Sequence, residues 1–191
     1  GSIKDRMIAY VVRRAQERDE FGENTTFIEA TSGNTGIALA AAGAALGNPV
    51  KIIMPCNMSE ERKQMMRAFG AEVVEVGHSD FQGAIALRGQ MMLTGEDVWS
   101  PMQFENLDNV ECHRDTTGPE IHLQLDPNMP WSGFVGGAGT GGTMMGMHDY
   151  RDKMKFLDYK CVLVVPEEDA QNHGIQGIND GQDFLLDPSK M

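Results

Sequence analysis

Two polar, glycine-containing turns in this chain have the composition of anion-binding loops. The first is Thr31-Ser32-Gly33-Asn34-Thr35-Gly36, between an apolar run at 27–30 and an alanine-rich segment at 37–46. Its glycines allow a close approach of the backbone, and its hydroxyl and amide groups surround a predicted helix start, where N–H groups attract anions. This turn could bind a carboxylate or a phosphate. An ordinary capped helix uses the same residue types, so the turn alone leaves both interpretations open.

The second turn, 136–143, is richer still in glycine. Its Gly139-Thr140-Gly141-Gly142-Thr143 portion offers backbone N–H groups and two hydroxyls at a helix start, a combination typical of phosphate sites. It is not a Walker loop, because no Gly-Lys-Ser/Thr follows. Gly137, Gly139 and Gly142 also fit the loose dinucleotide-binding pattern, with Glu167 placed to bind a ribose. A Rossmann nucleotide site and a purely structural turn therefore stay as alternatives.

Lys4 is the third candidate, at the first turn of an amphipathic helix predicted over 2–18. The helix dipole disfavours a cation there and so favours the neutral amine that Schiff-base chemistry needs. A surface lysine is the simpler interpretation of this residue alone. Cys112-His113 and the other histidines lack metal-ligand spacing, so we expect no metal site.

The elements that position these groups alternate between strand and helix. Apolar periodicity and capping residues predict strands at 27–30, 50–54, 71–76, 97–100, 133–135 and 161–165, and helices at 2–18, 37–46, 60–69, 81–93 and 144–156. Residues 101–113 are expected to be irregular, with a further helix starting at Thr116-Thr117-Gly118-Pro119-Glu120. This alternation predicts an α/β fold of parallel sheets covered by helices. Both glycine-rich turns would lie at the carboxyl edges of strands, where ligands bind in such sheets.

Composition excludes several classes of protein. The 191 residues, 41% of them hydrophobic, can form one core divided between two small lobes. The net charge of −12 argues against a nucleic-acid or anionic-membrane partner. No apolar run approaches the ~20 residues that cross a bilayer, and no signal-peptide pattern opens the chain. The odd, scattered cysteines suit a reducing compartment, so we expect a cytoplasmic protein.

Together the motifs resemble the family of cysteine synthase (O-acetylserine sulfhydrylase) and cystathionine β-synthase, fold-type II enzymes dependent on pyridoxal 5′-phosphate. Five motifs occur in the family's order: Ser2-Ile3-Lys4-Asp5-Arg6, Thr31-Ser32-Gly33-Asn34-Thr35-Gly36, Gln103-Phe104, His113 through Thr116-Thr117-Gly118-Pro119-Glu120-Ile121, and Gly139-Thr140-Gly141-Gly142-Thr143. The segments 54–62 and 173–178 are also similar to the family. The resemblance implies a small N-terminal lobe over 1–105 and an incomplete large lobe over 106–191.

The resemblance also implies a role for each matching residue. Lys4 would form the Schiff base with pyridoxal 5′-phosphate and move the α-proton of the substrate. Asn34 would hydrogen-bond the 3′-oxygen of the cofactor. The residues that would hold its phosphate are Gly139, Thr140, Gly141, Gly142 and Thr143. Those that would bind the α-carboxylate of an amino-acid substrate are Thr31, Ser32, Gly33, Thr35 and Gln103.

The chain departs from the family in length. Residues expected before Lys4 are absent, as is the last part of the large lobe, with the serine-bearing segment that contacts the pyridine nitrogen. We expect the unpaired sheet edges to favour a homodimer.

The reaction implied by the resemblance is β-replacement on O-acetylserine by sulfide, which gives L-cysteine. β-Elimination from cysteine or cystathionine, a lyase reaction, needs the same lysine and the same proton transfer, so it stays open. The alternative of another class is a degenerate, non-catalytic module of the same fold, which the missing segments would favour.

Overall fold

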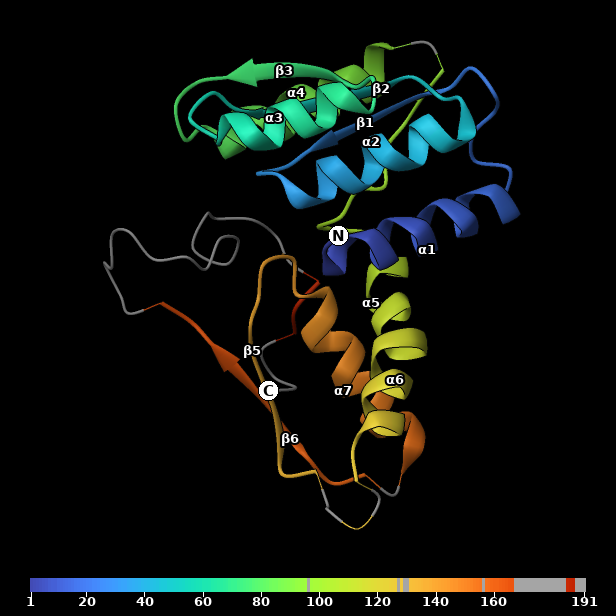
Figure 1. Ribbon diagram of the computed structural model, residues 1–191, viewed down its shortest axis with the longest axis vertical. Helices are drawn as coiled ribbons and strands as arrows, with labels where there is room; N and C mark the ends of the chain where they lie inside the picture. Colours follow the sequence, from blue (N-terminus) through green and yellow to red (C-terminus); the bar gives the residue numbers. More distant parts are fainter. Residues whose placement is uncertain (96, 127, 129–130, 156, 167–184, 188–191) are drawn as a thin grey trace. The chain divides into compact units, whose positions relative to one another are not determined.

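The computed structural model describes residues 1–95, 97–126, 128, 131–155, 157–166 and 185–187. The chain divides into two compact units, Gly1–Met102 and Gln103–Met191, which run from blue to green and from yellow to red (Figure 1). The interpretation of these units as the small and large lobes of one enzyme stays a prediction. The predicted polar region from Glu167 onward, with the family segment at 173–178, lies almost wholly outside the described residues.

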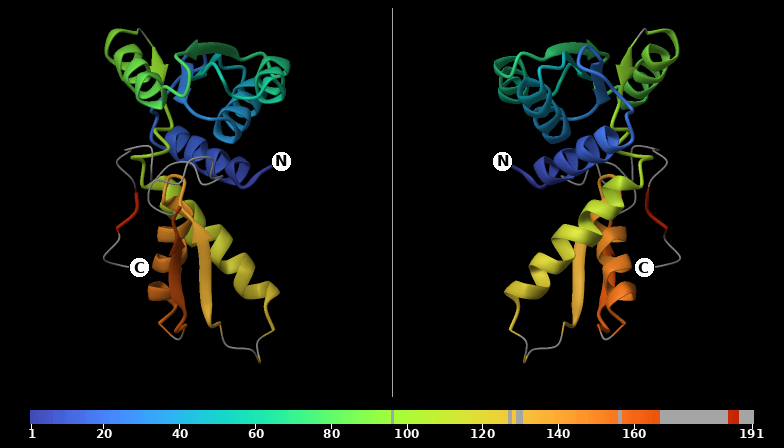
Figure 2. Two further views of the ribbon diagram at one scale, coloured as in Figure 1. Left: turned by 90° about the vertical axis from the view of Figure 1, so that its left-hand side faces the viewer. Right: turned by 90° about the vertical axis from the view of Figure 1, so that its right-hand side faces the viewer.

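The first unit is a parallel sheet with helices on both faces. Its strands are β1 (Thr26–Ala30), β2 (Val50–Pro55), β3 (Glu72–Val76) and β4 (Val98–Trp99), in the order β3-β2-β1-β4. All three pairings are parallel, with Phe27 opposite both Val50 and Trp99. Helix α4 (Phe81–Thr94) covers one face, whereas α2 (Asn34–Leu46) and α3 (Glu60–Ala68) lie on the other (Figure 2). Helix α1 (Ile3–Glu17) packs against α2.

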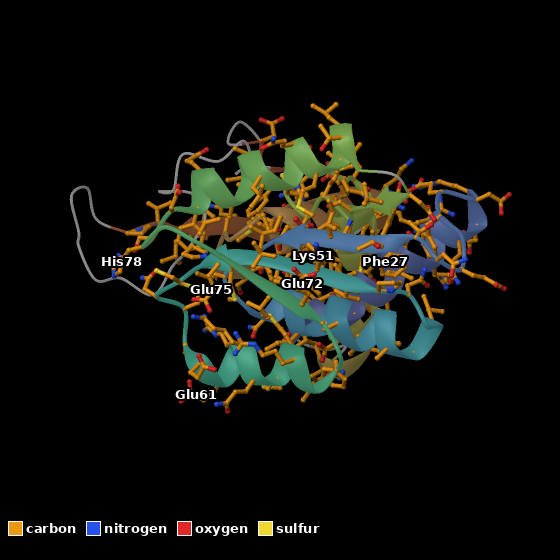
Figure 3. All side chains as sticks on the ribbon, turned by 90° about the horizontal axis from the view of Figure 1, so that it is seen from above. Phe27, Lys51, Glu61, Glu72, Glu75 and His78 are labelled. Atoms are coloured by element: carbon orange, nitrogen blue, oxygen red, sulfur yellow. The ribbon has the colours of Figure 1, made fainter. Side chains whose placement is uncertain are left out.

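Coverage of both faces explains why β1 and β2 are continuous apolar runs rather than alternating ones. Phe27, Ile28, Ile52, Ile53 and Met54 are fully buried. The β3 edge is more polar, and Lys51 on β2 pairs with Glu72 on β3 at 3.1 Å (Figure 3). The sheet therefore has an apolar centre and a charged edge.

Two features of the first unit were not expected from the sequence. Helix α2 begins at Asn34 and not at residue 37, because Gly33 is its N-cap, so Asn34 and Thr35 belong to the helix. A buried ion pair also joins β1 to α4: Arg88 Nη1 lies 3.3 Å from Glu29 Oε1, with the two side chains 5% and 0% exposed.

The second unit combines one helical segment with a two-stranded parallel sheet. Strands β5 (Gly133–Gly137) and β6 (Lys160–Val164) pair in parallel, connected by α7 (Gly142–Met154). The core joins Met144, Met147, Tyr159 and Cys161. Burial raises the pKa of both Tyr159 and Cys161, and the Tyr159 hydroxyl donates to the Met147 carbonyl at 2.5 Å.

Residues 101–107 are irregular as expected and a helix does start at Gly118, but the expectation is wrong over 108–117, where the chain is already helical. Helix α5 (Asp108–Cys112) continues through a π-helical segment η1 (His113–Thr117) into α6 (Gly118–Gln124). The threonines do not cap a helix, because Thr116 Oγ1 donates back to the Cys112 carbonyl at 2.7 Å and Thr117 Oγ1 bonds His113 Nδ1 at 2.8 Å. Pro119, which has no N–H, follows the π-helical segment, where the hydrogen-bond register changes.

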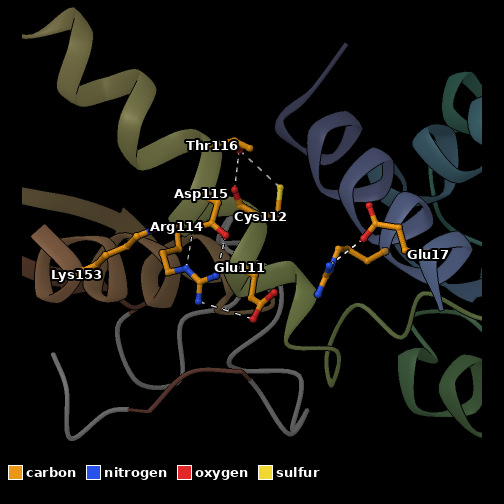
Figure 4. Close-up of polar contacts among 8 residues, drawn as sticks. Glu17, Glu111, Cys112, Arg114, Asp115, Thr116 and Lys153 are labelled. Carbon is orange, nitrogen blue, oxygen red and sulfur yellow. Dashed lines mark hydrogen bonds and ion pairs between the residues drawn. The ribbon is translucent and has the colours of Figure 1, made fainter.

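Helix α7 lies unusually close to this helical segment. A Cβ at Gly146 would lie 2.5 Å from the Cβ of His113 and 2.6 Å from the Val110 carbonyl, so only glycine permits this approach. On the outer side, Asp115 accepts from Arg114 at 2.7 Å and from Lys153 of α7 at 3.2 Å (Figure 4). The glycine contact and these ion pairs hold α7 to η1.

Within the part of the chain that the structure describes, no helix is both long enough and apolar enough to span a membrane.

Candidate active site

The first candidate loop follows β1 at the carboxyl edge of the sheet in the first unit. The Thr31 N–H donates to the Ile53 carbonyl at 3.0 Å, and Thr31 Oγ1 accepts from the Gly33 N–H at 3.1 Å. From α3, Arg62 Nη1 donates to the Ser32 carbonyl at 3.0 Å. Gly33 lies so close to Arg62 that a Cβ there would be 2.5 Å from Arg62 Cδ. The loop is therefore held on one side by β2 and on the other by an arginine.

The two helices that follow the candidate loops begin differently from the other helices described. Helix α2 has Gly33 as N-cap and α7 has Gly141; neither cap makes a side-chain hydrogen bond, and neither first turn contains an acidic residue. Each remaining described α-helix has an acidic residue in its first turn or, in α4, a capping Asp80. An anion at the start of α2 or α7 thus meets the positive end of the dipole without a competing carboxylate on that turn.

The contrast is clear at α3, where Glu60 and Glu61 occupy the first turn. The pKa of Glu61 is lowered by its own backbone N–H and then by the Ser59 side chain. Helix α3 therefore carries its own anion, whereas α2 and α7 have no acidic residue in the first turn.

Lys4 lies in the first turn of α1, which is fixed by a capping box. The Lys4 N–H donates to Ser2 Oγ at 3.2 Å, and the Ser2 N–H donates to Asp5 Oδ2 at 2.7 Å. These contacts hold the backbone that carries the Lys4 amine. Helices α1 and α2 run in the same direction across the first unit (Figure 1), and Lys4 and Asn34 each belong to the first turn of their helix.

The second candidate loop connects β5 to α7 in the second unit. Gly141 has φ +86°, in the left-handed region that favours glycine. Thr140 Oγ1 accepts from Asn109 Nδ2 at 3.0 Å and from the Gly142 N–H at 3.4 Å. Thr143 Oγ1 lies 3.2 Å from His113 Nε2. Both threonine hydroxyls of the loop are thus contacted from the α5–η1 segment.

Asn109 and His113 were not assigned a role from the sequence. They are four residues apart on one face of the α5–η1 segment and are 0% and 1% exposed. Asn109 Nδ2 also donates to the carbonyl of Gln103 at 2.9 Å, which places Gln103 and Thr140 around one amide. The signal in the sequence was the i, i+4, i+8 spacing of Asn109, His113 and Thr117, which is visible only if a helix is assigned there.

The predicted site residues fall into two groups. Lys4, Asn34 and the Thr31–Thr35 loop belong to the first unit, whereas Gln103 and the Gly139–Thr143 loop belong to the second. A single site built from both groups stays a prediction. Among the described residues, no three His, Cys, Asp or Glu side chains are grouped so as to hold a metal ion.

The sequence model of the pyridoxal-phosphate dependent enzymes matches residues 1–183. This chain belongs to that family. It is 40% identical to cysteine synthase B of Escherichia coli over 178 residues, which cover 92% of this chain and 57% of the relative. It is 36% identical to the cysteine synthase of Helicobacter pylori, over 97% of this chain and 61% of the relative.

Solved structures of this family share the fold. A hydrogen sulfide-producing enzyme of Fusobacterium nucleatum matches with a TM-score of 0.85 and 38% identity, over 97% of this chain and 58% of that one. Cysteine synthase of Entamoeba histolytica matches with a TM-score of 0.85 and 34% identity, over 99% and 58%. The resemblance to fold-type II enzymes is confirmed, as is the α/β class. The chain spans about three fifths of the length of these relatives.

Family membership makes pyridoxal phosphate the cofactor in place of a dinucleotide, and binding of its phosphate by the second loop stays a prediction. The described residues fit that group. A Cβ at Gly142 would lie 2.2 Å from Asn109 Oδ1, so glycine allows the loop backbone to approach Asn109 this closely. Two hydroxyls flank this backbone, and the first turn of α7 has no acidic residue, as binding of a dianion requires.

Proposed function

We propose that this chain is part of a pyridoxal-phosphate dependent cysteine synthase, which converts O-acetylserine and sulfide into L-cysteine and acetate. The observation that carries the proposal is the pair of glycine-capped helix starts, one in each unit, neither with an acidic residue in its first turn. Helix α2 would bind the carboxylate of the amino acid and α7 the phosphate of the cofactor. The relatives named cysteine synthase, at 36–40% identity, support this choice of substrate.

When bound, pyridoxal phosphate withdraws electrons from the α-carbon of the attached amino acid, which makes its α-proton acidic. The Lys4 amine takes that proton and later returns it. The hydroxyls of Thr31, Ser32 and Thr35, with the Gln103 amide, hold the substrate carboxylate. The bond between Cβ and the acetate oxygen breaks, hydrosulfide forms the new Cβ–S bond, and acetate leaves with the negative charge.

The remaining residues orient the cofactor. Asn34 would donate from its amide to the 3′-oxygen, and the Gly139–Thr143 loop would hold the phosphate through backbone N–H groups and two hydroxyls. Fixing the phosphate and the carboxylate would limit the motion of the substrate relative to the Lys4 amine, and such proximity contributes to the rate.

An absorption spectrum with added pyridoxal phosphate, beside Lys4→Ala, tests the proposal. The parent chain should show a visible band that borohydride removes and should form cysteine from O-acetylserine and sulfide, and Lys4→Ala should lose both. Lys51→Ala, which removes a lysine of the sheet edge, is the matched control and should keep both. Binding of the cofactor without turnover would favour the non-catalytic alternative.

β-Elimination is the second candidate function. Its support is the match to a structure described as a hydrogen sulfide-producing enzyme, at 38% identity. Cysteine supplied alone distinguishes the two reactions, because only elimination releases sulfide, pyruvate and ammonia. Formation of pyruvate at a rate above that of cysteine synthesis would replace the first proposal with this one.

We also propose a cytoplasmic homodimer without nucleic-acid or membrane partners. The net charge of −12 and three free cysteines support this, and β3 leaves one edge of the sheet in the first unit for pairing. Sedimentation velocity should give twice the mass of the chain, and cell fractionation should place the protein in the cytosol.

A further inference from the structure

Asn109 uses both of its amide protons on residues of the proposed binding site. Its side chain is fully buried, and Nδ2 donates to the Gln103 carbonyl at 2.9 Å and to Thr140 Oγ1 at 3.0 Å. Its other amide atom, Oδ1, is buried and has no hydrogen-bond partner among the described residues. The amide is therefore oriented by its donors.

The contact with Thr140 decides which way the threonine hydroxyl can act. A hydroxyl oxygen has two acceptor positions and a single proton. Thr140 Oγ1 accepts from Asn109 Nδ2 and from the Gly142 N–H at 3.4 Å, so both acceptor positions are used. The proton of Thr140 is then left to be donated, and a phosphate oxygen is an acceptor.

We infer that Asn109 is a positioning residue that makes Thr140 a dedicated hydrogen-bond donor to the cofactor phosphate, while its second proton holds Gln103. The inference rests on the proposed function, since it takes the Gly139–Thr143 loop as the phosphate site. The inference adds Asn109, a residue outside the loop, to the proposed phosphate site. It also fixes the direction of one hydrogen bond, because the Asn109 amide must donate to Thr140.

The packing around Asn109 supports this assignment. A Cβ at Gly142 would lie 2.2 Å from Asn109 Oδ1, so the amide lies directly against the first residue of α7. Replacing the Asn109 amide by a carboxylate of the same shape replaces the hydrogen-bond donor that faces Thr140 with an acceptor. The Thr140 hydroxyl would then donate to the carboxylate, and a negative charge would face the phosphate.

Asn109→Asp is therefore the first test, and Asn106→Asp is its matched control. Asn106 lies in the same segment, but its Oδ1 accepts from the Asp108 N–H at 2.9 Å, a role that a carboxylate fills equally well. The dissociation constants of pyridoxal phosphate and of pyridoxal, which lacks the phosphate, are measured from the visible band of the full chain. Asn109→Asp should raise the dissociation constant of pyridoxal phosphate by a factor of about 10 to 100 and change that of pyridoxal less than about twofold. Asn106→Asp should change neither.

The two ligands separate the possible outcomes. Equal weakening of both by Asn109→Asp would indicate general damage and overturn the inference. Tight binding of pyridoxal phosphate by the parent, unchanged in Asn109→Asp, would overturn it while leaving the proposed function intact. Equal affinity of the parent for both ligands would instead contradict the phosphate site and hence the proposed function.

A second set of variants serves if Asn109→Asp does not fold. Asn109→Ala and Thr140→Val should each raise the dissociation constant of pyridoxal phosphate about tenfold. The double variant should raise it little more than either single variant, because Asn109 acts through Thr140. A double variant weakened by the product of the two factors would contradict the coupling.

Discussion

His113 Nε2 lies 3.2 Å from the hydroxyl of Thr143, the last residue of the proposed phosphate loop, while its Nδ1 bonds Thr117 at 2.8 Å. A buried imidazole thus bridges the π-helical segment and the first turn of α7. This arrangement fixes the Thr143 hydroxyl from a residue 30 positions away in the sequence.

Replacing His113 should therefore weaken the binding of the cofactor. We expect His113→Phe, which keeps an aromatic side chain but has no ring nitrogen, to raise the dissociation constant of pyridoxal phosphate about tenfold. Titration of the visible band measures it. His78→Phe, in an exposed turn of the first unit, is the control and should have no effect. An unchanged constant in His113→Phe would show that Thr143 needs no partner.

The close approach of α7 to the α5–η1 segment predicts opposite effects of alanine at two glycines. A Cβ at Gly146 would meet His113 and Val110, so Gly146→Ala should lower the free energy of unfolding by about 1–3 kcal/mol. Gly89, inside α4, has open space around its Cβ position, and Gly89→Ala should raise this free energy by about 0.5–1 kcal/mol. Urea unfolding measures both. A stabilising Gly146→Ala would mean that the helices are not in this contact.

The ion pair between Glu29 and Arg88 should be far more sensitive to mutation than the pair at the sheet edge. Arg88→Met leaves a carboxylate in the core and should cost about 3–5 kcal/mol of unfolding free energy. Glu29→Gln combined with Arg88→Met should recover most of this loss, because no buried charge remains. Lys51→Met, which breaks the exposed pair with Glu72, should cost about 1 kcal/mol or less. Similar losses for Arg88→Met and Lys51→Met would contradict the burial of the first pair.

Asp115 should make the stability of the second unit depend on pH in the acidic range. Arg114 and then Lys153 lower the pKa of Asp115 from 3.8 to about 2, despite the opposing effect of burial. A carboxyl group with a lowered pKa stabilises the folded state at pH above its ordinary value, and this stabilisation is lost as the pH falls through about 2.

We therefore expect Asp115→Asn to lower the unfolding free energy at neutral pH by about 1 kcal/mol or less, since the pair is partly screened by solvent. The difference from the parent should disappear as the pH falls from about 4 to about 2. Urea titrations across this range measure it, with Asp158→Asn, at an exposed position, as the control. A difference that grows in acid would contradict the direction of the pKa shift.

Local patterns of residues were enough to predict several elements of this fold. Continuous apolar runs predicted β1 and β2, glycine and proline marked their ends, and the two glycine-rich turns predicted anion-binding loops before α2 and α7. Lys4 was a candidate from its place at a predicted helix start, but its role was implied only by the resemblance to the family and stays a prediction. These signals are local because capping, turn formation and the helix dipole act within a few residues.

The residues that support these loops, by contrast, were identified from the folded chain. Asn109 contacts Thr140 from 31 residues away, and Arg62 reaches Ser32 from 30 residues away. Of the helical segment at 108–124 only the last part, Gly118–Gln124, was expected, and the rest was missed for the same reason. Its Thr116 and Thr117 have the composition of a cap, yet their hydroxyls bond within the helix while its buried polar face packs against α7. Burial of polar side chains is stabilising only where distant partners satisfy them, and a pattern of neighbouring residues does not contain that information.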